Sequence, residues 1–259
     1  MQQFLGMAGY EFKMCIKRAG FWIVYGLLAA FYLVTIMAPG KSSAVDVIDA
    51  SLIWQQAGQL VFTFNVFLPL LAGILAADRM QRDFRGGVRE LQRSAPLSNA
   101  RYILAKYVGV LGSVLLPVFI IIAMDGIMIV AGGHAPVGFL WPLFLAFLSI
   151  TVPAHAFVVA FSLACPLVLP LRVYQVLFTG YWFWGNLLSP QAFPTISDTV
   201  LNAVGQFPLY AYFGGLRAPD TTAPYTPAQA ILNLAVLSGM IALALIGINI
   251  YMRAQAKKA

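Results

Sequence analysis

Long, uninterrupted runs of apolar residues dominate the pattern along this chain. A hydrocarbon core of about 30 Å requires roughly 20 helical residues, and six runs approach or exceed that length. The runs are continuously apolar, whereas the strands of a membrane barrel alternate over about ten residues. We therefore predict an all-α polytopic membrane protein with six transmembrane helices, at Ala19–Ala38, Gly58–Ala77, Ile103–Ala131, Phe139–Leu163, Val173–Leu188 and Ala230–Met252.

Residues 1–18, which precede the first run, show a different pattern. Apolar side chains recur there at steps of three and four, whereas Lys13 and Lys17 fall on another face. This spacing predicts an amphipathic helix that lies in the membrane interface. The alternative is a cytoplasmic extension of the first span. The apolar positions are Phe4, Leu5, Ala8, Phe12, Cys15 and Ile16.

The composition supports a membrane protein. The 259 residues are 61% hydrophobic and 10% charged, whereas a soluble domain has about 25% charged and 45–50% apolar residues. A soluble enzyme, a nucleic-acid-binding domain and a disordered chain are therefore excluded. Without an internal repeat, residues 1–259 are expected to form a single transmembrane domain.

The distribution of Lys and Arg predicts the orientation. With the N-terminus in the cytoplasm, the inner segments hold fourteen of these residues and the outer segments hold two, Lys41 and Arg217. This asymmetry follows the positive-inside rule. We expect a protein integral to the cytoplasmic membrane, with both termini in the cytoplasm. The net charge of +7 is then explained by the Lys and Arg residues that set the orientation, and it does not indicate a nucleic-acid partner.

The loop at residues 78–101, between the second and third spans, is the most patterned polar segment. Gly86 and Gly87 predict a break in it, and Ser98 or Asn99 is placed to cap the third span. The simpler interpretation is a loop that only anchors the topology. Four arginines at steps of three and four would form one basic stripe on a helix: Arg82, Arg85, Arg89 and Arg93.

This segment resembles the first cytoplasmic loop of type-2 ABC exporter permeases. In that family an acidic residue and a Gly precede Glu-Leu, then Ser-x-Pro-x-Ser, then a Lys near the start of the third span. The plan of an amphipathic N-terminal helix, six spans and a longer outer segment before the last span is also similar. The matching positions are Asp78, Asp83, Gly87, Glu90, Leu91, Ser94, Pro96, Ser98, Arg101, Tyr102, Lys106 and Gly109.

The resemblance implies a permease that moves an amphipathic, lipid-like or peptide-like substrate out of the cytoplasm. It also implies two protein partners, a second copy of the chain and a separate cytoplasmic ABC ATPase. We expect membrane lipid around the chain and no cofactor or metal. The resemblance and the arginine stripe place ATPase docking at Arg82, Asp83, Arg85, Gly87, Arg89, Glu90 and Arg93.

The chain has no visible nucleotide site of its own. Gly40-Lys41-Ser42 ends like a phosphate-binding loop, but Thr35 stands where that motif requires Gly. No catalytic constellation is visible either. We therefore expect a transport subunit and not an enzyme, with ATP hydrolysis performed by the partner.

Two ionisable residues within the spans, Asp125 and His155, are candidates for function, because charges inside a membrane are costly. We favour structural roles, with Asp125 solvated near the outer surface and His155 hydrogen-bonded between helices. The Pro-rich outer segment 189–229 is either a re-entrant element or a plain loop.

Two other functions remain open at this stage. An ion-coupled secondary transporter would need coupling sites at the midplane, often in repeated halves. An integral membrane enzyme that modifies lipids would need a catalytic cluster near the interface.

Overall fold

The computed structural model describes residues 2–37, 48–85, 98–214 and 225–256, and this part of the chain is helical and contains no strand. Four stretches are long and apolar enough to cross a membrane. A fifth results if α1 (Gln2–Ile16) and α2 (Ala19–Met37), which meet at a bend of 64°, are counted as one span. The four stretches are Ile53–Phe84, Asn99–Ala131, Val137–Leu167 and Pro227–Ala256.

Two of these stretches are series of shorter helices, and the other two, α7 (Asn99–Ala131) and α12 (Pro227–Ala256), are continuous. The first series comprises α3 (Ile53–Asn65), α4 (Leu68–Ala76) and α5 (Asp78–Arg85). The second comprises α8 (Leu140–Ala146), a π-helical turn at Phe147–Thr151 and α9 (Val152–Ala164). The remaining elements are α10 (Leu171–Asn186), α11 (Gln206–Tyr212) and short 3₁₀ turns at Ala50–Leu52, Val137–Phe139 and Cys165–Leu167.

Local chemistry explains where several helices begin. Ser98 caps α7, as predicted, because its hydroxyl accepts a hydrogen bond from the Arg101 backbone amide. Pro69 and Pro153 lie in the first turns of α4 and α9, where a missing backbone N–H costs nothing. Both helices follow an irregular turn.

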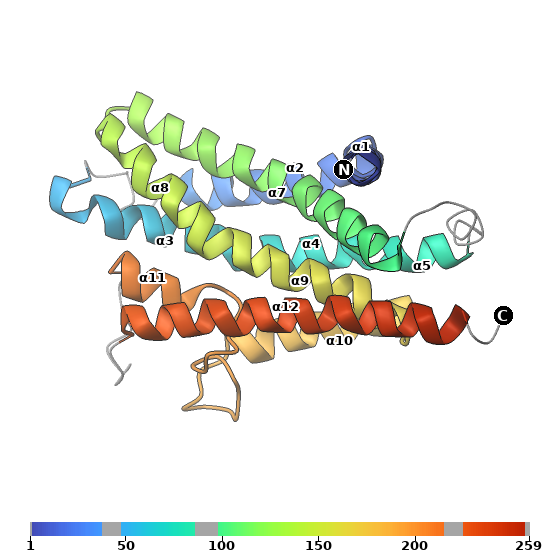
Figure 1. Cartoon of the computed structure of the whole chain (residues 1–259). Helices are drawn as coiled ribbons and strands as arrows, with labels where there is room; N and C mark the ends of the chain where they lie inside the picture. Colours follow the sequence, from blue (N-terminus) through green and yellow to red (C-terminus); the bar gives the residue numbers. More distant parts are fainter. Residues whose placement is uncertain (1, 38–47, 86–97, 215–224, 257–259) are drawn as a thin grey trace.

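The long helices lie side by side along the molecule, whereas α1 is seen end-on and crosses α7 (Figure 1). Helix α9 is central and packs against α4, α7 and α12. Its residues Val158, Val159 and Ala160 are completely buried. The core is therefore continuous from α1 to α12.

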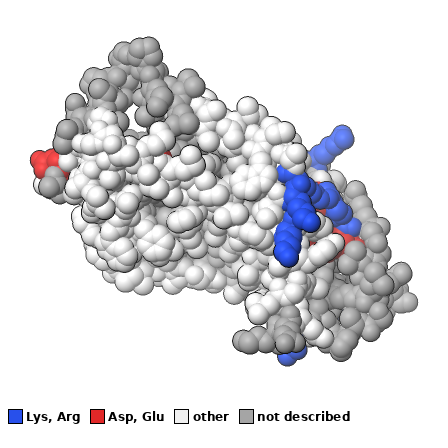
Figure 2. Space-filling model, turned by 90° about the horizontal axis from the view of Figure 1, so that it is seen from above, with Lys and Arg blue, Asp and Glu red and all other residues white. Residues whose placement is uncertain are grey.

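The outer surface is apolar over most of its length. In α12 only 17% of the most apolar 18-residue stretch is buried inside the protein. Side chains such as Leu243 and Ile250 are more than half exposed. Figure 2 shows Lys and Arg gathered at the end that carries α5, with Asp and Glu both beside them and at the opposite end, and other residues between the two ends. This distribution is that of a membrane protein with one basic end.

Four of the predicted spans fall inside the four long stretches, so the prediction of an all-helical membrane protein is confirmed. The predicted first span coincides with α2, which has 19 residues, and the predicted fifth span coincides with α10, which has 16. Both are shorter than the roughly 20 residues of an upright span. Crossing by these two helices stays a proposal.

Candidate functional site

Lys106 of α7 stands at the centre of a buried ionic cluster. Its Nζ lies 2.7 Å from Oε1 of Glu11 on α1 and 2.6 Å from Oδ2 of Asp83 on α5. Tyr102, one turn earlier on α7, donates its hydroxyl to the same oxygen of Asp83. These four side chains, the Lys106 cluster, join three helices that are far apart in the sequence.

The cluster is shielded from water, which makes its charges interdependent. The side chain of Lys106 is 1% exposed, that of Glu11 7% and that of Asp83 14%. Removing one partner of a buried ion pair typically costs about 3–5 kcal/mol, because the other charge stays behind without compensation. Lys106 therefore holds two carboxylates that would otherwise repel each other in a medium of low dielectric.

A glycine lets α1 approach α7 one turn beyond this cluster. A Cβ added to Gly109 would lie 2.5 Å from the carbonyl oxygen of Ala8, which is too close for any side chain at this position. The buried side of α1 consists of Ala8, Glu11 and Cys15. The N-terminal helix is thus docked on α7 by close backbone packing as well as by the ion pair.

The same end of the molecule holds an arginine cluster around Asp78. Arg82 pairs with Asp78 one helical turn away, while Arg79 Nε and Arg18 Nη1 lie 3.7 Å and 3.8 Å from its carboxylate. Three guanidinium groups thus share one carboxylate, which leaves an excess of positive charge. Of these three arginines, Arg82 belongs to the stripe predicted from the sequence, and its side chain is 51% exposed.

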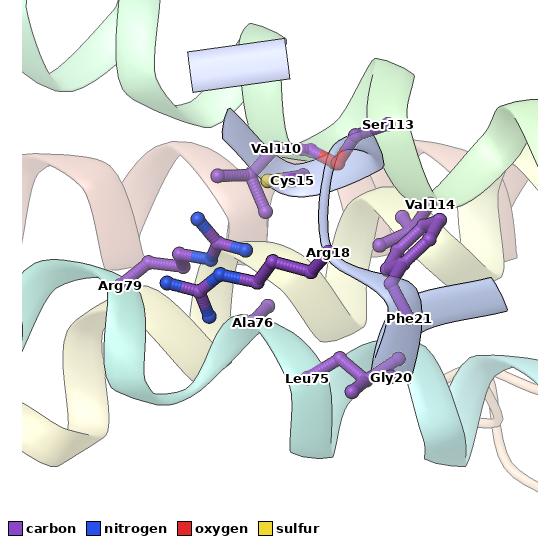
Figure 3. A pocket seen from close by; sticks show the side chains of 10 residues that line it. All are labelled: Cys15, Arg18, Gly20, Phe21, Leu75, Ala76, Arg79, Val110, Ser113 and Val114. Atoms are coloured by element: carbon purple, nitrogen blue, oxygen red, sulfur yellow. The ribbon is translucent and has the colours of Figure 1, made fainter. Parts of the chain in front are cut away.

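A cavity of about 380 Å³ opens beside this cluster at the bend between α1 and α2. Figure 3 shows the side chains of Arg18 and Arg79 extending toward each other along one side of it. Most of the remaining wall is apolar. The lining residues are Cys15, Arg18, Gly20, Phe21, Leu75, Ala76, Arg79, Val110, Ser113 and Val114.

The predicted docking residues fall into two groups. Arg82, Asp83 and the backbone of Arg85 lie in α5, and the side chain of Asp83 points inward to Lys106. The other four residues lie outside the described part of the chain: Gly87, Arg89, Glu90 and Arg93.

The two intramembrane candidates are placed differently from expectation. Asp125 is buried at 9% exposure and not solvated, and its Oδ2 has no hydrogen-bond partner among the described residues. His155 is fully buried, and its Nδ1 bonds to the Thr151 carbonyl of the preceding turn, so the hydrogen bond does not run between helices. A carbonyl only accepts, so Nδ1 carries the proton and Nε2 is left as a buried acceptor.

At the opposite end, asparagine side chains hold the C-terminal part of the irregular segment 187–205 against the bundle. Asn186 Oδ1 accepts from the backbone amides of Ala203 and Val204 at 2.7 and 3.1 Å, and Asn65 donates to the Val204 carbonyl at 2.5 Å. Asn233 of α12 donates to the carbonyls of Val200 and Asn202. Residues 202–205 are therefore buried with hydrogen-bonded backbone groups, whereas residues 188–194 are exposed.

Sequence reasoning missed both Glu11 and the role of Lys106. A signal was present, since Glu11 is the first acidic residue of the chain and the next is Asp46. Lys106 also interrupts an apolar run that begins at Ile103. A lone acid in an apolar helix and a lone Lys in a span each require a partner, and here they partner each other.

Within the described residues, no group of three or more His, Cys, Asp or Glu side chains is arranged to hold a metal ion. Comparison of the sequence with protein-family models and with curated proteins finds no match.

Proposed function

We propose that this chain is the transmembrane permease subunit of an ATP-driven ABC exporter. One observation carries the proposal. Three positions of the loop motif, Asp83, Tyr102 and Lys106, converge in the Lys106 cluster, although the loop separates the first from the other two. A fourth, Gly109, makes the adjacent close contact with α1. Residues that only kept a loop on one side of the membrane would need no such arrangement.

The cluster suggests how a partner's movement would reach the spans. Helix α5 continues the second span toward residues 86–97, where the ATPase would dock. Since Asp83 ties α5 to Lys106 and Glu11, a push on the loop would move α1 and α7 with it. Docking then biases the equilibrium between inward-facing and outward-facing arrangements.

The proposed topology has six crossings with the basic end in the cytoplasm. Helices α2 and α10 are the two additional crossings. Helix α10 is short, and the buried residues 202–205 with α11 complete its path at the outer side as a re-entrant element. The gathering of Lys and Arg at one end supports this orientation.

The proposed assembly is a homodimer that carries two ATPase subunits. Gly26 on α2 and Gly180 on α10 each have open space where a Cβ would point. Neighbouring apolar side chains such as Leu27 and Val176 are exposed. These two faces are free to pack against a second copy through small residues, and an amphipathic, lipid-like or peptide-like substrate would pass between the copies.

The test is copurification with an ABC-type ATPase encoded in the neighbouring gene, followed by ATP hydrolysis in proteoliposomes. The complex is expected to hydrolyse ATP, and the permease alone is expected to be inactive. Asp83→Asn should lower stimulation of hydrolysis by substrate without releasing the ATPase. The exposed Asp49→Asn serves as control. Failure of any such ATPase to associate with the chain would contradict the proposal.

One observation favours the ion-coupled alternative. Two spans are interrupted, at Val66–Phe67 and at the π-helical turn Phe147–Thr151. Near these breaks, Asn65, Thr151 and His155 carry buried polar atoms that have no partner among the described residues. Interrupted helices form ion sites in secondary transporters. Substrate movement driven by a pH gradient in proteoliposomes that contain the permease alone, and abolished in His155→Asn, would favour this function.

A further inference from the structure

The guanidinium of Arg79 is a buried charge whose donors are incompletely satisfied. The residue is 4% exposed, and its Nε and Nη1 have no hydrogen-bond partner among the described residues. Its nearest carboxylate, on Asp78, lies 3.7 Å from Nε, beyond hydrogen-bond distance. A buried cation with free donors is costly, so such a group calls for a missing partner.

The missing partner must be an anion, because the arginine side chains around Arg79 already outnumber the carboxylates that they contact. Arg18 and Arg82 share the same Asp78 carboxylate with Arg79. In Figure 3 the side chains of Arg18 and Arg79 extend toward each other at the cavity wall. Two guanidinium groups brought together repel unless an anion lies between them, and their planar donors match the oxygens of a phosphate.

The cavity has the size and the walls for such a ligand. Its volume of about 380 Å³ falls within the range of small-molecule sites. Phe21, Leu75 and Val114 line it together with the arginines. An apolar wall beside a pair of guanidiniums suits a charged head that carries a hydrocarbon tail.

We infer that the cavity between Arg18 and Arg79 is a binding site for a phosphate-type anion. The anion binds the guanidinium of Arg79 and is shared with Arg18. Two sources offer this chemistry, the headgroup of an anionic phospholipid and free inorganic phosphate. Basic pockets between membrane helices are known to suit lipid headgroups, and the apolar wall adds contact for a lipid alone. The inference does not depend on the proposed exporter function.

The test uses the full-length protein, purified in detergent, stripped of lipid and measured by native mass spectrometry. The probes are phosphatidylglycerol, phosphatidylcholine and inorganic phosphate. Wild type is expected to bind phosphatidylglycerol in preference to phosphatidylcholine. Both Arg79→Gln and Arg18→Gln should weaken this binding about tenfold. Arg253→Gln, which removes an exposed charge on α12, is the control and should bind like wild type.

A third variant keeps both arginines and separates the two sources. A Cβ at Gly20 meets no atom within 4 Å, so Gly20→Leu adds bulk to the cavity lining without a clash at its base. If lipid is the ligand, this variant should lose phosphatidylglycerol, and inorganic phosphate should not displace the lipid from wild type. If free phosphate is the ligand, phosphate should bind to wild type and to Gly20→Leu but not to Arg18→Gln.

Thermal unfolding of each variant separates loss of binding from loss of fold. If Arg79→Gln does not fold, the Arg18→Gln variant still tests the inference, because the Arg18 side chain is partly exposed and its loss should be tolerated. Equal binding of phosphatidylglycerol and phosphatidylcholine, with no binding of phosphate, would overturn the inference. Binding by Arg18→Gln and Arg79→Gln that matches Arg253→Gln would overturn it as well.

Discussion

Glu11 and Lys106 lie 95 positions apart in the chain, and their side chains meet at 2.7 Å inside the helix bundle. The contact fixes the N-terminal helix to α7 at the point where Asp83 fixes α5. One ammonium group thus anchors both α1 and the helix that leads to residues 86–97. Substitutions of Lys106 therefore test most directly whether this contact holds α1, α5 and α7 together.

We expect Lys106→Met to destabilise the protein strongly. It leaves the carboxylates of Glu11 and Asp83 buried without a cation, a loss of about 3–5 kcal/mol. Thermal unfolding in detergent measures the change. Lys13→Met on the exposed side of α1 is the matched control and should unfold close to wild type. Equal melting temperatures for the two variants would show that the buried pair contributes no stability.

Neutralising the whole cluster should restore part of this loss. In the triple variant Glu11→Gln, Asp83→Asn, Lys106→Met, no charge is left uncompensated, and replacing buried ion pairs by neutral groups is often tolerated. We expect its melting temperature to lie between those of wild type and Lys106→Met. A triple variant less stable than Lys106→Met alone would indicate that packing, and not charge, governs the site.

A methyl group at Gly109 should displace α1 from α7. The added Cβ would lie 2.5 Å from the Ala8 carbonyl oxygen, and overpacking of this kind costs about 1–3 kcal/mol. Gly239→Ala on α12 is the control, because nothing lies within 4 Å of its Cβ position. That change should raise stability by about 0.5–1 kcal/mol. Increased proteolysis within residues 1–18 of Gly109→Ala alone would locate the effect in α1.

The turn before α11 should be equally intolerant. Gly205 has φ +95° and meets Ile150 Cγ2 at 2.5 Å from its Cβ position, so Gly205→Ala is both strained and overpacked. Gly214 has φ +63° and open space around it, so Gly214→Ala is only strained. Thermal unfolding should show the larger loss for Gly205→Ala, and the reverse order would contradict the described burial of this turn.

Glu90 lies outside the described residues, and its prediction rests on the proposed function. A carboxylate gains nothing from an anionic membrane surface, so Glu90 within a basic segment is better explained by a protein partner. We expect Glu90→Ala to leave folding nearly intact, since an exposed local pair contributes only about 0.3–0.5 kcal/mol. ATPase association or coupled hydrolysis should fall. If Glu90→Ala, Arg85→Ala and Arg89→Ala all behave as wild type, the docking assignment fails.

The proposed dimer is tested at Gly180. Nothing lies within 4 Å of its Cβ position, so Gly180→Trp should leave the fold of one copy unchanged and weaken contact between copies. Gly239→Trp, at an equally open position on α12, is the control. Size-exclusion chromatography with light scattering of the ATPase-bound complex should show dissociation only for Gly180→Trp. A wild-type complex with a single permease copy would exclude the arrangement.

The parts of the fold that sequence predicted correctly depend on local signals. The apolar run from Ile103 to Ala131 and the capping hydroxyl of Ser98 are both properties of a few neighbouring residues, and α7 begins and ends accordingly. Helical periodicity likewise predicted a helix before the first span, and α1 covers most of residues 1–18.

The parts that sequence did not predict depend on contacts between distant residues. Asp83 resembled a surface acid in a polar loop, and only the meeting of α1, α5 and α7 makes it a buried partner of Lys106. Asn186 and Asn233 are single amide side chains in apolar runs. No periodicity in the sequence indicates that they form hydrogen bonds with backbone groups of a distant segment. The cavity beside Arg79 exists only because α1 and α2 meet at an angle.

The asparagine contacts around segment 187–205 also constrain the order in which the protein is assembled during synthesis. Asn65 and Asn186 precede this segment in the chain, but Asn233 follows it, in the final helix. Until α12 has entered the membrane, the carbonyls of Val200 and Asn202 lack the amide that they accept from. Unsatisfied backbone groups are excluded from lipid. The hydrogen bonds to these two carbonyls can therefore form only once the last helix lies in the bundle.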